Sequence, residues 1–127
     1  MVASLKLFPG MCPDVVKAVL GIEGLKGLVV ETFGAGNGLN EPWFETLLTE
    51  AMANGLVIVN ITQCQGGTVE DKYEASSHFW RAGIVNGRDM TFEAAITKLM
   101  FVLAYAPARE DAIRLFTTNL CGEVSVE

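Results

Sequence analysis

Residues 31–48 read ETFGAGNGLNEPWFETLL and place three glycines between an apolar run and a helical pattern, which is the layout of a phosphate-binding loop. The glycines give G-x-G-x-G, with Leu39 where a dinucleotide loop has its third glycine, and the Gly-Lys-Ser/Thr of a Walker loop is absent. Glu41 falls in the first turn of the expected helix, where its carboxylate would repel an anion. The pattern therefore argues against a phosphate site.

Two other interpretations of this turn stay open. In the first, the glycines relieve backbone strain in a tight strand-to-helix turn. In the second, three exposed polar side chains contact a small polar ligand, namely Thr32, Asn37 and Asn40. These residues follow the carboxyl end of an expected strand, where open α/β sheets usually bind ligands.

A second candidate segment, residues 60–67 (NITQCQGG), also lies at the carboxyl end of an apolar run. Thr62, Gln63 and Cys64 would reach into the same crevice as the first turn. The alternative is a loop in which the Thr and Gln side chains satisfy local backbone groups and Cys64 packs as a small hydrophobic residue. Spacing alone does not separate these two interpretations.

The only histidine, His78, lies in an acidic segment, residues 69–80 (VEDKYEASSHFW). We expect it to be a packed or surface histidine rather than a catalytic base, with its acidic neighbours on a solvated face. No Ser-His-Asp or Cys-His pairing is indicated. One histidine and three widely spaced cysteines also give no zinc-binding pattern. The residues thus indicate no metal, no cofactor and no complete catalytic set.

Apolar runs that alternate with helical patterns would position these residues. Strands are expected at residues 5–8, 25–33, 56–62 and 84–87, and helices at residues 13–20, 40–54, 89–106 and 109–120. Residues 63–83 read as a loop followed by a weak helix. This order predicts an α/β fold with a four-stranded parallel sheet and helices on its faces.

Side-chain patterns also predict where two of the helices begin and which face is buried. Asn40 is the expected N-cap of the second helix, and Thr91 is the expected N-cap of the long helix that follows the fourth strand. The long helix has apolar residues spaced by three and four, which predict its buried stripe: Phe92, Ala95, Ile96, Leu99, Met100 and Leu103.

Composition limits the classes of partner that the chain could have. The chain has 127 residues, of which 50% are hydrophobic, and its net charge of −6 argues against nucleic acid and gives no support to an anionic membrane surface as partner. No apolar run approaches the ~18 residues that span a bilayer, and no signal peptide is visible. The three cysteines, Cys12, Cys64 and Cys121, follow no paired spacing, so we expect reduced thiols and a cytoplasmic protein.

Four segments together are more specific than any single motif. GLVVETFGAGNG, GLVIVNITQC, AGIVNGRDMTFEAAITKLMFVLA and NLCGEVSVE occur in an order and spacing that resemble the C-terminal domain of cytosolic, type I L-asparaginases, and ETFGAGNG is closer to the animal branch. The resemblance covers nearly the whole chain. It implies a flavodoxin-like three-layer αβα sandwich. It also implies that residues 1–127 form one domain, with the catalytic domain of an enzyme that hydrolyses asparagine to aspartate and ammonia absent from this chain.

The resemblance also implies roles for individual residues. Asn37 matches the asparagine of the family's Gly-x-Gly-Asn turn, and Tyr73 matches a tyrosine near the catalytic cleft, so both are expected at the edge of an active site. Thr62 and Cys64 match positions that line an asparagine effector site in bacterial relatives. Those relatives have an arginine where this chain has Glu31, and a carboxylate cannot pair with the carboxylate of the ligand.

The resemblance therefore implies a domain that is inactive alone. Its expected partners are L-asparagine or aspartate, the N-terminal catalytic domain and further copies of itself in a homo-oligomer. The alternative is a stand-alone flavodoxin-like module that mediates interactions or binds a small molecule without catalysis. A response-regulator receiver is a weaker rival, because the first expected strand is followed by Pro-Gly-Met-Cys rather than by acidic residues. A flavin-binding protein is a further rival, and it would be coloured as purified.

Overall fold

Strand β2 (Gly27–Thr32) lies at the centre of the protein, and its apolar run is covered on both faces. A computed structural model describes residues 1–32, 41–62, 83–87, 90–106 and 108–118 of the chain. Within it, Leu28, Val29 and Val30 have no exposed surface. A continuous apolar run of this kind is expected in a parallel strand that is buried on two sides.

The sheet is parallel throughout its described part. Its strands β1 (Val2–Lys6), β2, β3 (Val57–Thr62) and β4 (Val85–Asn86) are adjacent in chain order, β1-β2-β3-β4. Val29 therefore lies between Ser4 of β1 and Val59 of β3. Open α/β sheets often bind ligands at the point where the order of the strands reverses. The described strands follow chain order without such a reversal, so a ligand would have to bind along the carboxyl edge that they share.

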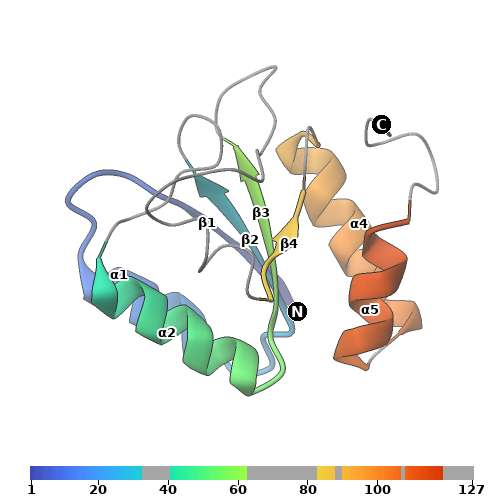
Figure 1. The fold of residues 1–127 in the computed structure, drawn as a ribbon, viewed down its shortest axis with the longest axis horizontal. Coiled ribbons are helices and arrows are strands. Elements are labelled where there is room, and N and C mark those ends of the chain that lie inside the picture. The colour runs from blue at the N-terminus through green and yellow to red at the C-terminus, as the bar shows by residue number, and fades with distance from the viewer. Residues whose placement is uncertain (33–40, 63–82, 88–89, 107, 119–127) are drawn as a thin grey trace.

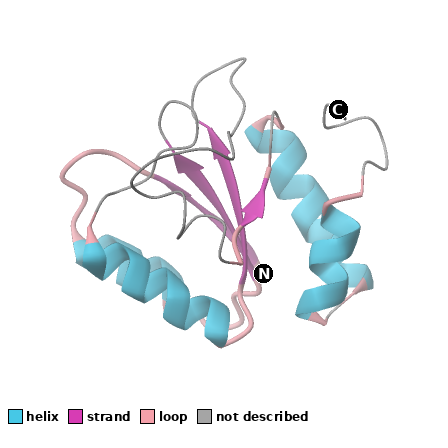
Figure 2. Cartoon of the chain, in the orientation of Figure 1, coloured by secondary structure: helices cyan, strands magenta, loops and turns pink. Residues whose placement is uncertain are grey.

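Two pairs of helices cover the two faces of the sheet (Figures 1 and 2). Helices α1 (Pro13–Leu20) and α2 (Pro42–Ala53) pack on the face that carries Leu28, Val30 and Ile58. Helices α4 (Phe92–Tyr105) and α5 (Arg109–Phe116) pack on the face that carries Val29, Val59 and Ile61. These layers confirm the expected αβα sandwich with a four-stranded parallel sheet.

The apolar stripes of the helices supply the other half of each core. Val16, Phe44 and Leu48 are fully buried on one face, and Leu99 and Val102 are fully buried on the other. Each such side chain stabilises the fold by about 1.5–3 kcal/mol relative to exposure. The prediction for Met100 is wrong, because its side chain is 52% exposed, on the outer side of α4.

The helix ends show which capping predictions hold. Thr91 is the N-cap of α4, and its hydroxyl accepts a hydrogen bond from the Ala94 amide at 3.1 Å. The N-cap of α2 is Glu41 rather than Asn40, because Pro42 fixes a helical φ and takes the first helical position. Gly55, which follows the C-cap of α2, has a φ of 101°, as expected for a left-handed helix end.

Candidate functional site at the carboxyl edge of the sheet

The carboxyl ends of β2, β3 and β4 lie at one edge of the sheet. The three strands are parallel, so the segments that follow them start from neighbouring positions (Figure 1). In the register, Thr32 lies beside Thr62, and Glu31 lies beside Ile61. The structure therefore brings together the two strand ends that the sequence singled out.

Thr32 is not an exposed ligand contact, and that expectation is wrong. Its exposed fraction is 0%, and its hydroxyl lies 2.8 Å from the Asn60 Oδ1 atom and 3.1 Å from the Ile61 carbonyl oxygen. One hydroxyl proton can be donated to either acceptor, so Thr32 satisfies polar groups inside the sheet. Thr32 is the last residue of β2, and by alternation its side chain is on the same face of the sheet as Leu28 and Val30, the face that α1 and α2 cover.

Asn60 is a buried polar residue that the sequence reasoning missed. It is 2% exposed, and in the register it lies between Val30 and Asn86. The amide of Gly87 donates a hydrogen bond to the Asn60 carbonyl oxygen at 2.8 Å. The available signal was the polar Asn within the apolar run LVIVNIT, since a polar side chain in a buried strand needs a partner.

Gly87 marks a close approach between the end of β4 and β3. A Cβ atom at this residue would lie 2.5 Å from Ile61 Cγ2 and 2.9 Å from the Asn60 carbonyl oxygen. No other residue fits without movement of the backbone. The glycine thus fixes how closely the chain leaving β4 follows β3 at this edge.

Glu31 occupies the opposite face of β2 from Thr32 because successive side chains in a strand alternate. It is half-buried, and it lies between Lys6 of β1 and Ile61 of β3. Its backbone carbonyl accepts a hydrogen bond from the Leu7 amide at 3.0 Å. The backbone of Glu31 is therefore fixed near the carboxyl end of β2, one residue before the strand ends.

Several other sequence-predicted residues lie outside the described residues. These are Asn37, Asn40, Gln63, Cys64, Tyr73 and His78. Thr62 is described only as the last residue of β3. Their roles at the edge of an active site or in an effector site remain predictions.

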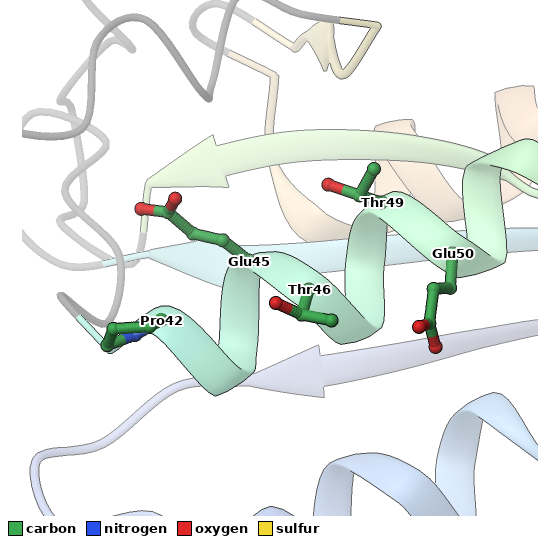
Figure 3. Close-up of a pocket in the computed structure, with 5 residues that line it drawn as sticks. All are labelled: Pro42, Glu45, Thr46, Thr49 and Glu50. Atoms are coloured by element: carbon green, nitrogen blue, oxygen red, sulfur yellow. The ribbon is translucent and has the colours of Figure 1, made fainter.

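A shallow hollow of about 360 Å³ lies on the outer side of α2 (Figure 3). Two carboxylates and two hydroxyls line it together with Pro42, and all of these residues belong to the one helix: Glu45, Thr46, Thr49 and Glu50. No basic side chain is among them. An acidic surface on a single helix is an ordinary solvated face, so we do not place a site there.

Other kinds of site find no support in the described part of the chain. Its His, Cys, Asp and Glu residues form no group of three that could hold a metal ion. Of its helices, none is long and apolar enough to cross a membrane. Cys12, which lies in this part, is exposed and forms no disulfide. In the described residues, the carboxyl edge holds the buried Thr32 hydroxyl and Asn60 amide, which bond to each other, and the half-buried side chain of Glu31.

Comparison with known proteins matches this fold to one family. The family model for the glutaminase/asparaginase C-terminal domain matches residues 1–116. The chain is 42% identical over 125 residues to the 60 kDa lysophospholipase of Homo sapiens, which covers 98% of this chain and 22% of that protein. It is 35% identical over 120 residues to L-asparaginase 1 of Escherichia coli (strain K12), which covers 94% of this chain and 35% of that protein.

A solved structure supports the same match. The crystal structure of L-asparaginase I from Vibrio cholerae O1 superposes with a TM-score of 0.90 at 29% identity, over 98% of this chain and 38% of that chain. The chain therefore spans between about a fifth and two fifths of the length of these proteins.

Proposed function

This chain belongs to the glutaminase/asparaginase C-terminal domain family, and from that premise we propose that it serves as the C-terminal domain of an L-asparaginase. The whole enzyme would hydrolyse asparagine to aspartate and ammonia. The observation that carries the proposal is the family match over residues 1–116, which includes every described strand and helix. We infer that the nucleophile and its activating groups belong to an N-terminal domain and that this chain alone is inactive.

The carboxyl edge would be the part of this domain that faces the substrate. In this proposal Asn37 and Tyr73 stand at the rim of the active site, on the segments that leave β2 and β3. The buried Thr32–Asn60 hydrogen bond and the glycine at residue 87 fix the strand ends from which these segments start. The domain would thus position rim residues without supplying the reacting atoms.

Regulation by asparagine at a second site is expected to differ from that of the bacterial relatives. The site would include Thr62 and Cys64 and would meet the Glu31 carboxylate at the end of β2. A carboxylate repels the carboxylate of an amino acid, where an arginine would pair with it in a bidentate fashion. We therefore propose that Glu31 weakens or abolishes effector binding at this position.

Assembly and location complete the proposal. The domain would contribute to a homo-oligomer of the full-length enzyme, which would act in the cytoplasm. Support for the location comes from an exposed Cys12 that forms no disulfide, as is usual in a reducing compartment.

The test compares two proteins in one assay. The 127-residue chain and a longer protein that joins it to the proposed N-terminal catalytic domain are each supplied with asparagine, and ammonia release is measured. We expect turnover by the longer protein and none by the isolated chain. Turnover by the isolated chain would show that it contains its own catalytic groups.

A lysophospholipid belongs in the same assay because one relative is named a lysophospholipase. Release of fatty acid without release of ammonia would replace the proposed substrate while leaving the family assignment in place. Inactivity of the longer protein toward both substrates would favour the alternative of a non-catalytic binding or interaction module.

A further inference from the structure

Asn-Gly pairs occur three times in this chain, at residues 37–38, 54–55 and 86–87. An asparagine that precedes glycine is the most open to attack by its own backbone, because glycine has no side chain to hinder the approach of its nitrogen to the asparagine side chain. The first pair lies outside the described residues. The other two pairs differ in exposure and in hydrogen bonding, so they should also differ in reactivity.

Asn54 is the C-cap of α2, and it is exposed. Within the described part of the chain its side-chain amide forms no hydrogen bond. The next backbone amide, that of Gly55, donates a hydrogen bond to the Met52 carbonyl oxygen at 2.9 Å. A Cβ atom at Gly55 would meet no atom within 4 Å, so the space around this pair is open. The last turn of a helix opens at little cost in free energy, and this pair lies directly at such an end.

The pair at residues 86–87, by contrast, lies in the sheet. Asn86 is half-buried and pairs with Asn60 in the register of β3 and β4. The Gly87 amide donates to the Asn60 carbonyl oxygen at 2.8 Å, and a Cβ atom at Gly87 would lie 2.5 Å from Ile61 Cγ2. The nitrogen that would have to attack is therefore bonded to a neighbouring strand in a tightly packed place. Its release requires the edge of the sheet to open, which costs more free energy than the fraying of a helix end.

We propose that Asn54 is a site of spontaneous deamidation. The end of α2 first opens, because Asn54 has a ψ of 8° and must rotate to bring its Cγ atom to the Gly55 nitrogen. The Gly55 nitrogen, having lost its proton, then forms a bond to Cγ. The bond between Cγ and the side-chain nitrogen breaks, and that nitrogen takes up a proton and leaves as ammonia.

The intermediate is a cyclic imide, in which the Gly55 nitrogen is bound to both carbonyl carbons of residue 54. Water adds to one of these carbons, and the bond from that carbon to the nitrogen breaks. The hydroxyl of the water stays on the carbon, and its hydrogen restores the N–H group of Gly55. The chain then continues through the backbone carbonyl, which gives aspartate, or through the former side chain, which gives isoaspartate. Water is the only co-reactant of this sequence of steps.

The new carboxylate would lie at an unfavourable place. It would follow the carboxyl end of α2, where the helix dipole is negative, and it would lie one turn after Glu50. The last turn of α2 holds no basic residue. Lys26, which lines the same hollow of about 200 Å³ as Asn54, would offset part of this repulsion. Deamidation should therefore lower the melting temperature of the domain by a few degrees.

Incubation of the 127-residue chain at physiological temperature, followed by peptide mapping in a mass spectrometer, tests the proposal. Replacement of the amide by a carboxyl group shows as a mass gain at residue 54. Asn54 should convert at least about tenfold faster than Asn86, since the two openings differ in free energy. In concentrated urea the two residues should convert at similar rates, because both then precede glycine in an unfolded chain. The rate at Asn54 should rise with pH, because the attacking nitrogen must lose its proton.

Two variants of the same residue serve as controls. Asn54→Gln keeps an uncharged amide, but its longer side chain forms the corresponding ring far more slowly. This variant should release less ammonia on incubation, by a single equivalent per chain, and should keep its melting temperature better than the unaltered chain. Asn54→Asp reproduces the charge of one product and should show the lowered melting temperature from the start.

Two results would overturn the proposal: an Asn54 that keeps its amide in the folded chain while another asparagine converts, or conversion at Asn54 that is no faster than at Asn86. The inference does not depend on the proposed function. Ammonia from deamidation needs no added asparagine and stops at a stoichiometric amount, whereas hydrolysis of asparagine by the longer protein continues with turnover.

Discussion

The Thr32 hydroxyl on β2 lies 2.8 Å from the Asn60 Oδ1 atom on β3, and both residues are buried. This hydrogen bond joins two neighbouring strands at the edge from which the proposed rim segments leave. Thr32, which the sequence suggested as a ligand contact, therefore has a structural role.

Replacing Thr32 by valine should destabilise the domain by about 1–3 kcal/mol, because the nearly isosteric side chain leaves the buried Asn60 oxygen without this donor. Thr32→Ser keeps the hydroxyl and removes one methyl group, so it should cost less, about 1 kcal/mol. Urea unfolding of the two variants measures the difference. A larger loss for serine than for valine would show that packing of the methyl group, rather than the hydrogen bond, is what matters here.

Gly87→Ala should destabilise the domain by about 1–3 kcal/mol or more, since the new Cβ would lie 2.5 Å from Ile61 Cγ2 and 2.9 Å from a backbone oxygen. Gly55→Ala is the matched control. Gly55 has a φ of 101°, but a Cβ atom there would meet nothing within 4 Å, so only backbone strain of about 1–2 kcal/mol applies. The discriminating measurement is asparagine hydrolysis by the longer protein: Gly87→Ala should reduce activity through the displaced edge, and Gly55→Ala should not.

Arg109 ties the start of α5 to the amino ends of two strands. Its Nε atom donates to the Leu56 carbonyl oxygen and its Nη2 atom to the Gly83 carbonyl oxygen, each at 3.1 Å. A lysine ammonium cannot reproduce this forked geometry, so Arg109→Lys should lower the free energy of unfolding by about 1–2 kcal/mol. Arg114→Lys should change it by less than about 0.5 kcal/mol, because the Arg114–Asp111 ion pair is exposed. Thermal and urea unfolding should rank the two variants in this order.

The sequence was informative where one residue and its near neighbours decide the outcome. The buried run at Leu28–Val30 follows from residue type, and the Thr91 cap follows from a polar residue directly before an apolar helical pattern. The layers follow because helices that alternate with parallel strands must cover both faces.

The errors arose where the outcome depends on a neighbour distant in sequence. Thr32 is buried, and its hydroxyl bonds to the side chain of Asn60, which is 28 residues later in the chain and lies on the neighbouring strand. Met100 falls within an apolar spacing that fits the stripe, yet the rotation of α4 on the sheet places it outside. Periodicity specifies that a helix has a buried face, but when apolar residues surround the helix it does not specify which face.

Glu31 leads to the last prediction, which concerns effector binding. If its carboxylate blocks the site, asparagine at millimolar concentration should leave the melting temperature of the chain unchanged. Glu31→Arg should instead give a saturable rise, because a ligand that binds only the native state must stabilise it. At a concentration about tenfold above the dissociation constant, the gain is about 1.4 kcal/mol, or a few degrees for a domain of this size. Differential scanning calorimetry with and without asparagine measures the effect.

Two comparisons make this result specific to a charge contact. Glu31→Gln removes the repulsion without adding a cation, so it should give a smaller rise than Glu31→Arg or none. Each variant is compared with its own ligand-free melting temperature, because Lys6 lies directly beside residue 31 in the sheet, and two like charges there would destabilise the arginine variant by a few tenths of a kcal/mol up to about 1 kcal/mol. A saturable rise in the unaltered chain would show that Glu31 tolerates the ligand, and the effector site would then have to bind it in another orientation.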